Sequence, residues 1–140
     1  MKKLITLILV LILIFTMAVP ALGAQDEPAM PNLLNTKLAS AKLSISDTGL
    51  AEVVVTCVGK TNVTSISTIT YLERKVGSSW VRVDIDVAND QWVDSTTSTR
   101  MVKSHTYQLS LSGEYRVVSE CTVISPDGTE VIDLDNSATW

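Results

Sequence analysis

Turn signals recur about every ten to fifteen residues along most of this chain, and the runs between them are rich in Val, Thr, Ser and Ile. The clearest turn signals lie at residues 47–49, 59–62, 77–79, 112–113 and 126–128. β-branched side chains favour extended backbone because they fill a pleated, half-buried surface. No sustained apolar period of 3.6 residues follows residue 24, so the pattern predicts an all-β domain.

This spacing predicts seven or so strands. The expected runs are residues 38–46, 51–58, 64–76, 80–87, 101–111, 114–124 and 129–140, with a loop at 88–98. Short strands separated by turns are typical of a sandwich of two antiparallel sheets.

Several runs also predict which of their faces is buried. In residues 51–58 the inward side chains would be Val53, Val55 and Cys57, and in residues 114–124 they would be Tyr115, Val117, Ser119, Cys121 and Val123. Residues 64–76 leave the choice open, because Ile69 and Tyr71 share one face while Leu72 and Val76 share the other.

The cleanest alternation of apolar and polar residues lies in residues 80–87. The inward side chains there would be Val81, Val83, Ile85 and Val87, and the outward ones Trp80, Arg82, Asp84 and Asp86. A period of two residues is what a half-buried strand requires.

The first 24 residues have the order of a secretory signal. Lys2 and Lys3 precede an almost unbroken apolar run over residues 4–19, and residues 20–24 supply a helix breaker and small residues. The run is short for a membrane span, which needs about 20 apolar residues. We therefore expect cleavage near Ala24 and a secreted protein; the alternative is a protein held at the membrane by an uncleaved signal.

Cleavage after Ala24 would leave 116 residues, which is enough for one domain with one core. Residues 25–37 contain two prolines and predict a flexible lead-in, followed by the domain itself at residues 38–140. The signal holds two of the eleven basic residues and none of the fifteen acidic ones, so the mature net charge is −6. Nucleic acid and anionic membranes are poor candidates as partners, because both attract clustered Lys and Arg.

Export also permits a disulfide between the two cysteines of the chain. Cys57 and Cys121 lie on inward faces of strands expected to oppose each other, so we predict one intramolecular bond. Closing that loop would stabilise the fold by up to about 4 kcal/mol through the lost entropy of the unfolded chain. Two buried free thiols are the alternative.

Two of these runs resemble strands of the immunoglobulin-type sandwich. Residues 53–57 (VVVTC) are similar to its second strand, which carries the first cysteine, and residues 111–117 (LSGEYRV) are similar to its sixth, with Tyr115 at the corner. The chain departs from the antibody pattern where Val117 replaces the second cysteine and where Tyr71 replaces the buried Trp of the third strand.

A closer resemblance is to small uncharacterised secreted proteins of Gram-positive bacteria with one immunoglobulin-like β-sandwich domain. It covers nearly the whole mature chain, through residues 71–74 (YLER), residues 77–80 (GSSW) and residues 115–117 (YRV). The resemblance implies a fold and an export route but no reaction, because such sandwiches host many unrelated functions.

Oxygen-bearing side chains are densest in and after the run 80–87. They are Asp84, Asp86, Asn89, Asp90 and Asp94. Calcium binds six to eight oxygens, but the spacing lacks the Gly and the terminal Glu of an EF-hand loop. A solvated strand face that resists pairing with other sheets is the simpler interpretation, so we predict neither a metal nor a cofactor.

His105 is the only histidine of the chain, and no serine lies in a Gly-x-Ser-x-Gly elbow. A small hydrolase would need His105 beside a serine and a carboxylate in one exposed cleft. In the absence of such a motif we expect no enzyme, but an exported, non-enzymatic interaction module that acts at or outside the cell envelope.

The tryptophans suggest where a protein or glycan partner would bind. Trp80, Trp92 and Trp140 could stack on sugars, which makes a carbohydrate-binding module the first alternative. Trp92, in the expected loop, is the one that packing explains least. We expect the partner to contact Trp80, Arg82 and Trp92, because loops on a rigid sandwich gather binding residues.

Overall fold

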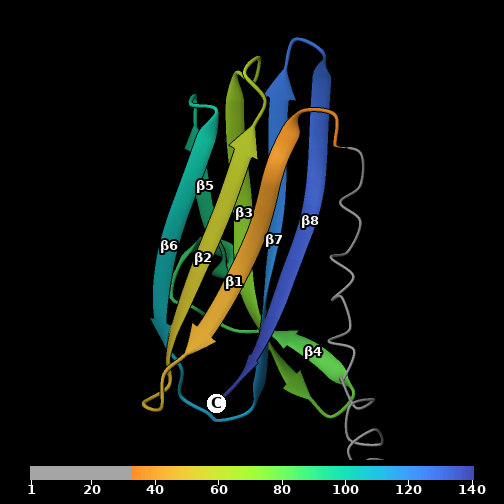
Figure 1. Cartoon of the computed structure of the whole chain (residues 1–140). Coiled ribbons are helices and arrows are strands. Elements are labelled where there is room, and N and C mark those ends of the chain that lie inside the picture. Colours follow the sequence, from red (N-terminus) through yellow and green to blue (C-terminus); the bar gives the residue numbers. More distant parts are fainter. Residues whose placement is uncertain (1–32) are drawn as a thin grey trace, which may run out of the picture. The chain divides into compact units, whose positions relative to one another are not determined.

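Two antiparallel sheets make up the part of the chain that the structure, a computed structural model, describes, residues 33–140 (Figure 1). The smaller sheet has the strand order β1-β2-β6, and the larger has the order β4-β3-β7-β8, with β5 also paired to β3. The bounds are β1 Thr36–Ile45, β2 Leu50–Gly59, β3 Ser65–Val76, β4 Ser79–Arg82, β5 Trp92–Thr96, β6 Arg100–Gln108, β7 Glu114–Ser125 and β8 Gly128–Thr139. The all-β prediction is confirmed. The predicted signal and most of the predicted lead-in fall outside the described residues.

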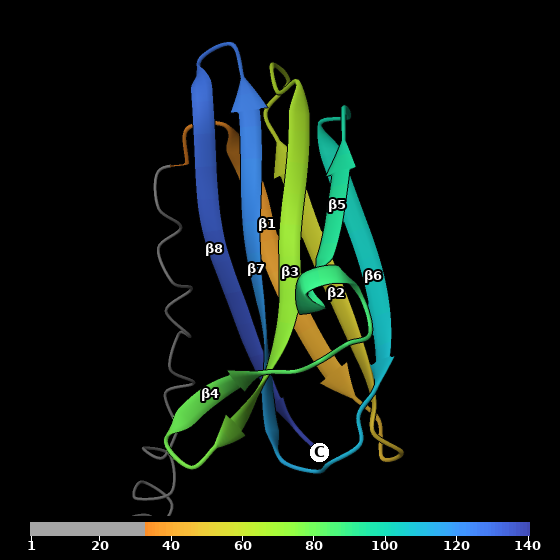
Figure 2. The ribbon, with the colours of Figure 1, turned by 180° about the vertical axis from the view of Figure 1, so that it is seen from behind.

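The two sheets lie face to face, with their inner side chains forming two buried clusters within residues 33–140 (Figures 1 and 2). One cluster includes Val53, Leu72 and Val117, and the other gathers around Cys57 and Cys121. No helix in the described range is long and apolar enough to cross a membrane.

The predicted inward faces of β2 and β7 are confirmed, since every residue named for them is buried. The sequence left open which face of β3 is buried. It is the face of Leu72, whose side chain is fully buried, while Ile69 and Tyr71 face outward. Two inward positions of β3 carry hydroxyls instead of apolar groups, and one of these, Thr70, shares a hydrogen bond of 2.8 Å with Ser119 of β7.

The strand expected at residues 80–87 is wrong beyond Arg82. The last backbone bond to β3 runs from the Val83 N–H to the Leu72 carbonyl, and the chain then leaves the sheet. Of the four residues expected inside, only Ile85 is buried, while Val81 and Val87 are exposed. The sheet has no room for a longer β4, because β5 occupies the same edge of β3 from Ile66 to Thr70.

The loop expected at residues 88–98 is therefore also wrong in part. A short 3-10 turn at Ala88–Asp90 turns the chain back, and β5 begins two residues later. Asp86, Asn89 and Asp90 take positive φ angles of 60°, 58° and 52°, which Asp and Asn adopt more readily than most residues. The strand expected at residues 101–111 ends at Gln108, so that Leu111 lies in the following connection.

One carboxylate ties the start of β1 to the edge strand β8. Glu130 accepts hydrogen bonds from the Leu34 and Asn35 N–H groups at 2.7 and 2.9 Å and from the Thr36 hydroxyl at 2.7 Å. Burial raises the pKa of Glu130, but these hydrogen bonds outweigh that effect and hold the pKa below its ordinary value of 4.5. The ionised carboxylate is therefore the form that the fold stabilises.

The two cysteines lie side by side in the core. Cys57 and Cys121 are fully buried free thiols within hydrogen-bond reach of each other. The hydrogen bond to Cys57, together with burial, raises the pKa of the Cys121 thiol. Because both sulfurs are buried, an oxidant would not reach them in the folded domain, so a disulfide would form while the chain folds and not afterwards.

We expect Glu130→Gln to lower the free energy of unfolding at pH 7 by about 1–2 kcal/mol, because the amide oxygen replaces a charged acceptor. The depressed pKa means that this stabilisation is fully present above pH 4.5 and is lost as the pH falls through the folded-state value. Urea unfolding of the mature chain at a series of pH values measures the difference. Glu120→Gln, on the outer face of β7, is the control, and a difference from wild type that stays constant down to about pH 3 would contradict the assignment.

The disulfide between Cys57 and Cys121 stays a prediction that mass spectrometry can test. We expect residues 25–140, produced under oxidising conditions and alkylated in denaturant without reductant, to take up no label, and to take up two labels after reduction. Denaturant is needed because burial would protect even free thiols from the reagent. Two labels without reduction would show that the thiols remain free.

Candidate functional site

A pocket of ≈190 Å³ opens at the end of the molecule where β4 leaves the sheets. It lies between the β3–β4 hairpin, the connection after β6 and the first residues of β7. We call it the hairpin pocket; its lining includes Arg74, Val76, Val81, Tyr107, Leu111 and Tyr115. Figure 1 shows β4 and the end of β3 standing away from the rest of the larger sheet.

Three apolar side chains that line the hairpin pocket are exposed to water, which is unfavourable for apolar groups. Val76, Val81 and Leu111 are 52 %, 50 % and 55 % exposed. Their exposure follows from the fold: the first two belong to the hairpin arms beyond the reach of β5, and Leu111 lies past the end of β6. Exposed apolar groups that gather in one place mark an interaction surface more often than scattered ones do.

Two tyrosines hold the walls of the pocket in place. The Tyr115 hydroxyl donates to the Leu111 carbonyl, and the Tyr107 hydroxyl donates to the Asp84 carbonyl at 2.7 Å. Burial raises the pKa of both phenols, and nearby carboxylates raise that of Tyr107 further. Both therefore stay protonated donors at neutral pH, so the segments after β6 and β4 are fixed before any ligand arrives.

Arg74 supplies a positive charge at the pocket that no carboxylate in residues 33–140 pairs with. Its Nη2 donates to the Ser112 carbonyl at 3.0 Å, and its Nε is buried without a hydrogen-bond partner. Gly113, with φ of +148°, lets the backbone approach closely, since a Cβ there would lie 3.3 Å from Nε. The guanidinium is thus held in place by the neighbouring backbone, but no carboxylate of residues 33–140 neutralises its charge.

Trp80 and Arg82 lie on the outer face of the larger sheet, and Arg82 also lines the rim of the pocket. The Trp80 ring lies under two cations, with Arg116 Cζ at 4.5 Å and Lys75 Nζ at 5.7 Å from its centroid. Arg82 places its Cζ 3.6 Å from the centroid of the Tyr71 ring. These aromatic–cation stacks hold the long side chains flat on the sheet.

Trp92 does not join that face, contrary to the sequence-based expectation. It begins β5 opposite Thr70 and points between the sheets, where it packs against the core. Its ring stacks on His105 with centroids 4.8 Å apart and planes 4° from parallel. The ring that seemed to lack a packing role therefore has one.

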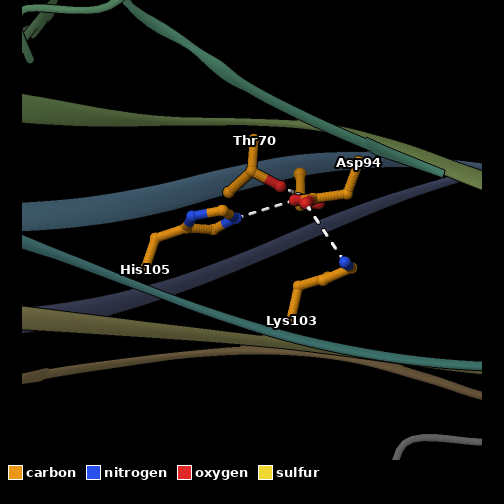
Figure 3. A network of polar contacts seen from close by, with 5 residues as sticks. Thr70, Asp94, Lys103 and His105 are labelled. Carbon is orange, nitrogen blue, oxygen red and sulfur yellow. Dashed lines mark hydrogen bonds and ion pairs between the residues drawn. The ribbon is translucent and has the colours of Figure 1, made fainter.

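Asp94 and His105 join the open edges of the two sheets (Figure 3). The Asp94 carboxylate is 2.7 Å from His105 Nε2 and 3.7 Å from Lys103 Nζ, and these partners sit on β6 while Asp94 sits on β5. Sequence reasoning missed this pair. Among the described residues no serine hydroxyl hydrogen-bonds to His105, whose ring contacts the Asp94 carboxylate.

The predicted oxygen cluster is not assembled as a metal site in the described range. Asp94 turns inward to His105, and Asp84 Oδ1 accepts the Asp86 N–H at 3.1 Å. No group of three or more His, Cys, Asp or Glu side chains within residues 33–140 is arranged to hold a metal ion.

Comparison of the chain with protein-family models, curated proteins and solved structures finds no match. The geometry of the hairpin pocket and of the surface beside it therefore carries the functional argument.

We expect Trp92→Ala to lower the free energy of unfolding by about 2–4 kcal/mol, because it removes a ring that packs against the core. Trp80→Ala, on the outer face, is the matched control and should cost less than about 1 kcal/mol, in the range of surface changes. Urea unfolding of both variants gives the comparison. Equal, small losses would mean that Trp92 is a surface residue after all.

Proposed function

We propose that this protein is an exported interaction module of a Gram-positive bacterium that acts at or outside the cell envelope and catalyses no reaction. The order of basic, apolar and small residues in positions 1–24 supports export. The mature net charge of −6 supports a partner other than nucleic acid or an anionic membrane.

We further propose that its sandwich is immunoglobulin-like. The order β1-β2-β6 opposite β4-β3-β7-β8 supports this, because it corresponds to strands A-B-E opposite C′-C-F-G of that fold. The hydrogen bond from Tyr115 at the start of β7 to the carbonyl four residues earlier is what a tyrosine corner makes. Cys57 on β2 and Cys121 on β7 would then lie on strands B and F, with Cys121 four residues beyond the position, held here by Val117, where that fold has its second cysteine.

The hairpin pocket is the observation that carries a binding role. It combines exposed apolar walls, phenol hydroxyls that fix those walls and a guanidinium without an acidic partner. A few convergent polar groups in an apolar hollow are the usual composition of a ligand site. Partner contact would extend from this pocket, across Arg82 at its rim, onto Trp80 on the outer face.

A glycan partner is the second candidate, and Trp80 is the residue that supports it. Trp80 is the one tryptophan of the described residues that faces outward from a sheet, since Trp92 stacks on His105 and the Trp140 ring lies against Gly49. Stacking of a sugar on Trp80 would have to displace Arg116 or Lys75 from the ring.

The experiment has an export arm and a binding arm. The full chain, expressed in a Gram-positive host, should appear in the medium as a product that begins at Gln25. The purified product should then bind to the envelope or secreted fraction of the source bacterium, and Val81→Asp should abolish that binding because it places a charge in the pocket wall.

The matched control is Val131→Asp, which changes a valine of similar exposure on β8. Circular dichroism and urea unfolding should find both variants folded. Retention of the protein in the cell would contradict export. Equal binding of the two variants, or equal loss, would contradict a role for the hairpin pocket.

A further inference from the structure

We propose that the hairpin pocket binds a carboxylate carried on an aliphatic group, with the Arg74 guanidinium as the partner of the carboxylate. This inference rests on the binding role proposed for this end of the molecule and names the chemistry that the pocket accepts.

The charge of the pocket selects an anion. Two arginines, Arg74 and Arg82, line the pocket, no acidic residue does, and neither arginine forms an ion pair within residues 33–140. Arg82 is held outward over Tyr71, so Arg74 is the cation available to a ligand. The carboxylates close to Tyr107 belong to the segment after β4 and do not line the pocket. They are those of Asp84, Asp86 and Asp90, and in addition to burial they raise the pKa of the Tyr107 hydroxyl.

Arg74 also has donors to spare. A guanidinium carries five N–H groups, and the Arg74 head makes one hydrogen bond among the described residues, to the Ser112 carbonyl. Planar guanidinium groups match the two oxygens of a carboxylate, and charged hydrogen bonds of this kind are stronger than neutral ones. Gly113 and the Ser112 carbonyl hold the head, so little side-chain entropy remains to be lost on binding.

The walls select an aliphatic companion for that carboxylate. Val76, Val81 and Leu111 expose methyl groups to the same hollow, whose ≈190 Å³ is somewhat larger than a cavity of about 150 Å³ that holds benzene. A chain of about six non-hydrogen atoms would fill it and cover these groups from water. A phosphate fits less well, because it carries up to two charges and needs several donors where the pocket offers one cation.

Titration of the ¹⁵N-labelled mature protein with hexanoate tests the proposal directly. We expect saturable shifts of the amides of Val81, Leu111 and Gly113 at millimolar concentrations, and weaker binding by at least about tenfold for hexan-1-ol, which corresponds to about 1.4 kcal/mol. The alcohol has the same chain length but no charge, so the comparison isolates the carboxylate.

Arg74→Gln should weaken hexanoate binding by about tenfold or more, and Arg100→Gln, an identical substitution at an exposed position of β6, should leave it unchanged. If Arg74→Gln fails to fold, Leu111→Asp replaces it, because this exposed side chain can accept a charge without entering the core, and that charge would repel the ligand.

A second arm identifies the natural source of the carboxylate. A short peptide that ends in leucine with a free carboxylate is compared with hexanoate and with its own C-terminal amide. Tighter binding of the free peptide than of hexanoate would assign the pocket to protein C-termini, and equal or weaker binding would assign it to free aliphatic acids; the amide should bind least.

Absence of saturable shifts at the pocket with every probe would overturn the proposal. So would equal binding of hexanoate and hexan-1-ol, or an equal effect of Arg74→Gln and Arg100→Gln. None of these results would touch the proposed interaction role, which is judged by the envelope-binding comparison of Val81→Asp with Val131→Asp.

Discussion

The free edge of β3 is shared by two strands, and the position of the hairpin pocket follows from that sharing. β7 takes one edge of β3 from Ser65 to Arg74, which leaves the other edge to β5 at one end and to β4 at the other. Since β5 holds Ile66 to Thr70, β4 pairs only from Glu73 onward. The hairpin therefore projects past the sheets (Figure 2), and its apolar residues face a hollow instead of a core.

The two sheets are also joined by side chains at both of their open sides. On one side the Glu130 carboxylate of β8 holds the backbone that leads into β1, and on the other Asp94 of β5 holds His105 and Lys103 of β6. Each carboxylate thus connects the two sheets at a side where their strands do not pair with each other. Because exposed backbone donors invite pairing with another chain, the Glu130 contacts also occupy two N–H groups, those of Leu34 and Asn35, that would otherwise be open.

The sequence allowed the central strands to be predicted well, because their pattern is set locally. Alternate residues of β2 and β7 are apolar, or small like Ser119, and a strand buried on one face needs no more than that. The alternation at Val81, Val83 and Ile85 is as regular, yet it lies in a hairpin arm and an irregular segment. β4 ends early because β5 occupies the same edge of β3. The sequence of residues 80–87 alone cannot predict this, because it contains no information about β5.

The candidate site was predictable only in part, for the same reason. Trp80 and Arg82 alternate with inward residues and do face outward, as their positions in the sequence indicate. Trp92 and Asp94 lie among polar residues, which suggested a loop, and only the pairing of β5 with β3 turns them inward. The pocket itself joins Arg74 to Leu111 across 37 positions, so its existence depends on the whole fold.

The tip of the β3–β4 hairpin is structurally isolated, and this gives the scaffold a capacity for change. Gly77 has no neighbouring atom within 4 Å of the place where a Cβ would stand. Residues inserted at this turn would meet neither the core nor the two carboxylates that join the sheets. A longer turn, or a grafted recognition loop, could thus be accommodated at this point while the sandwich stays as it is.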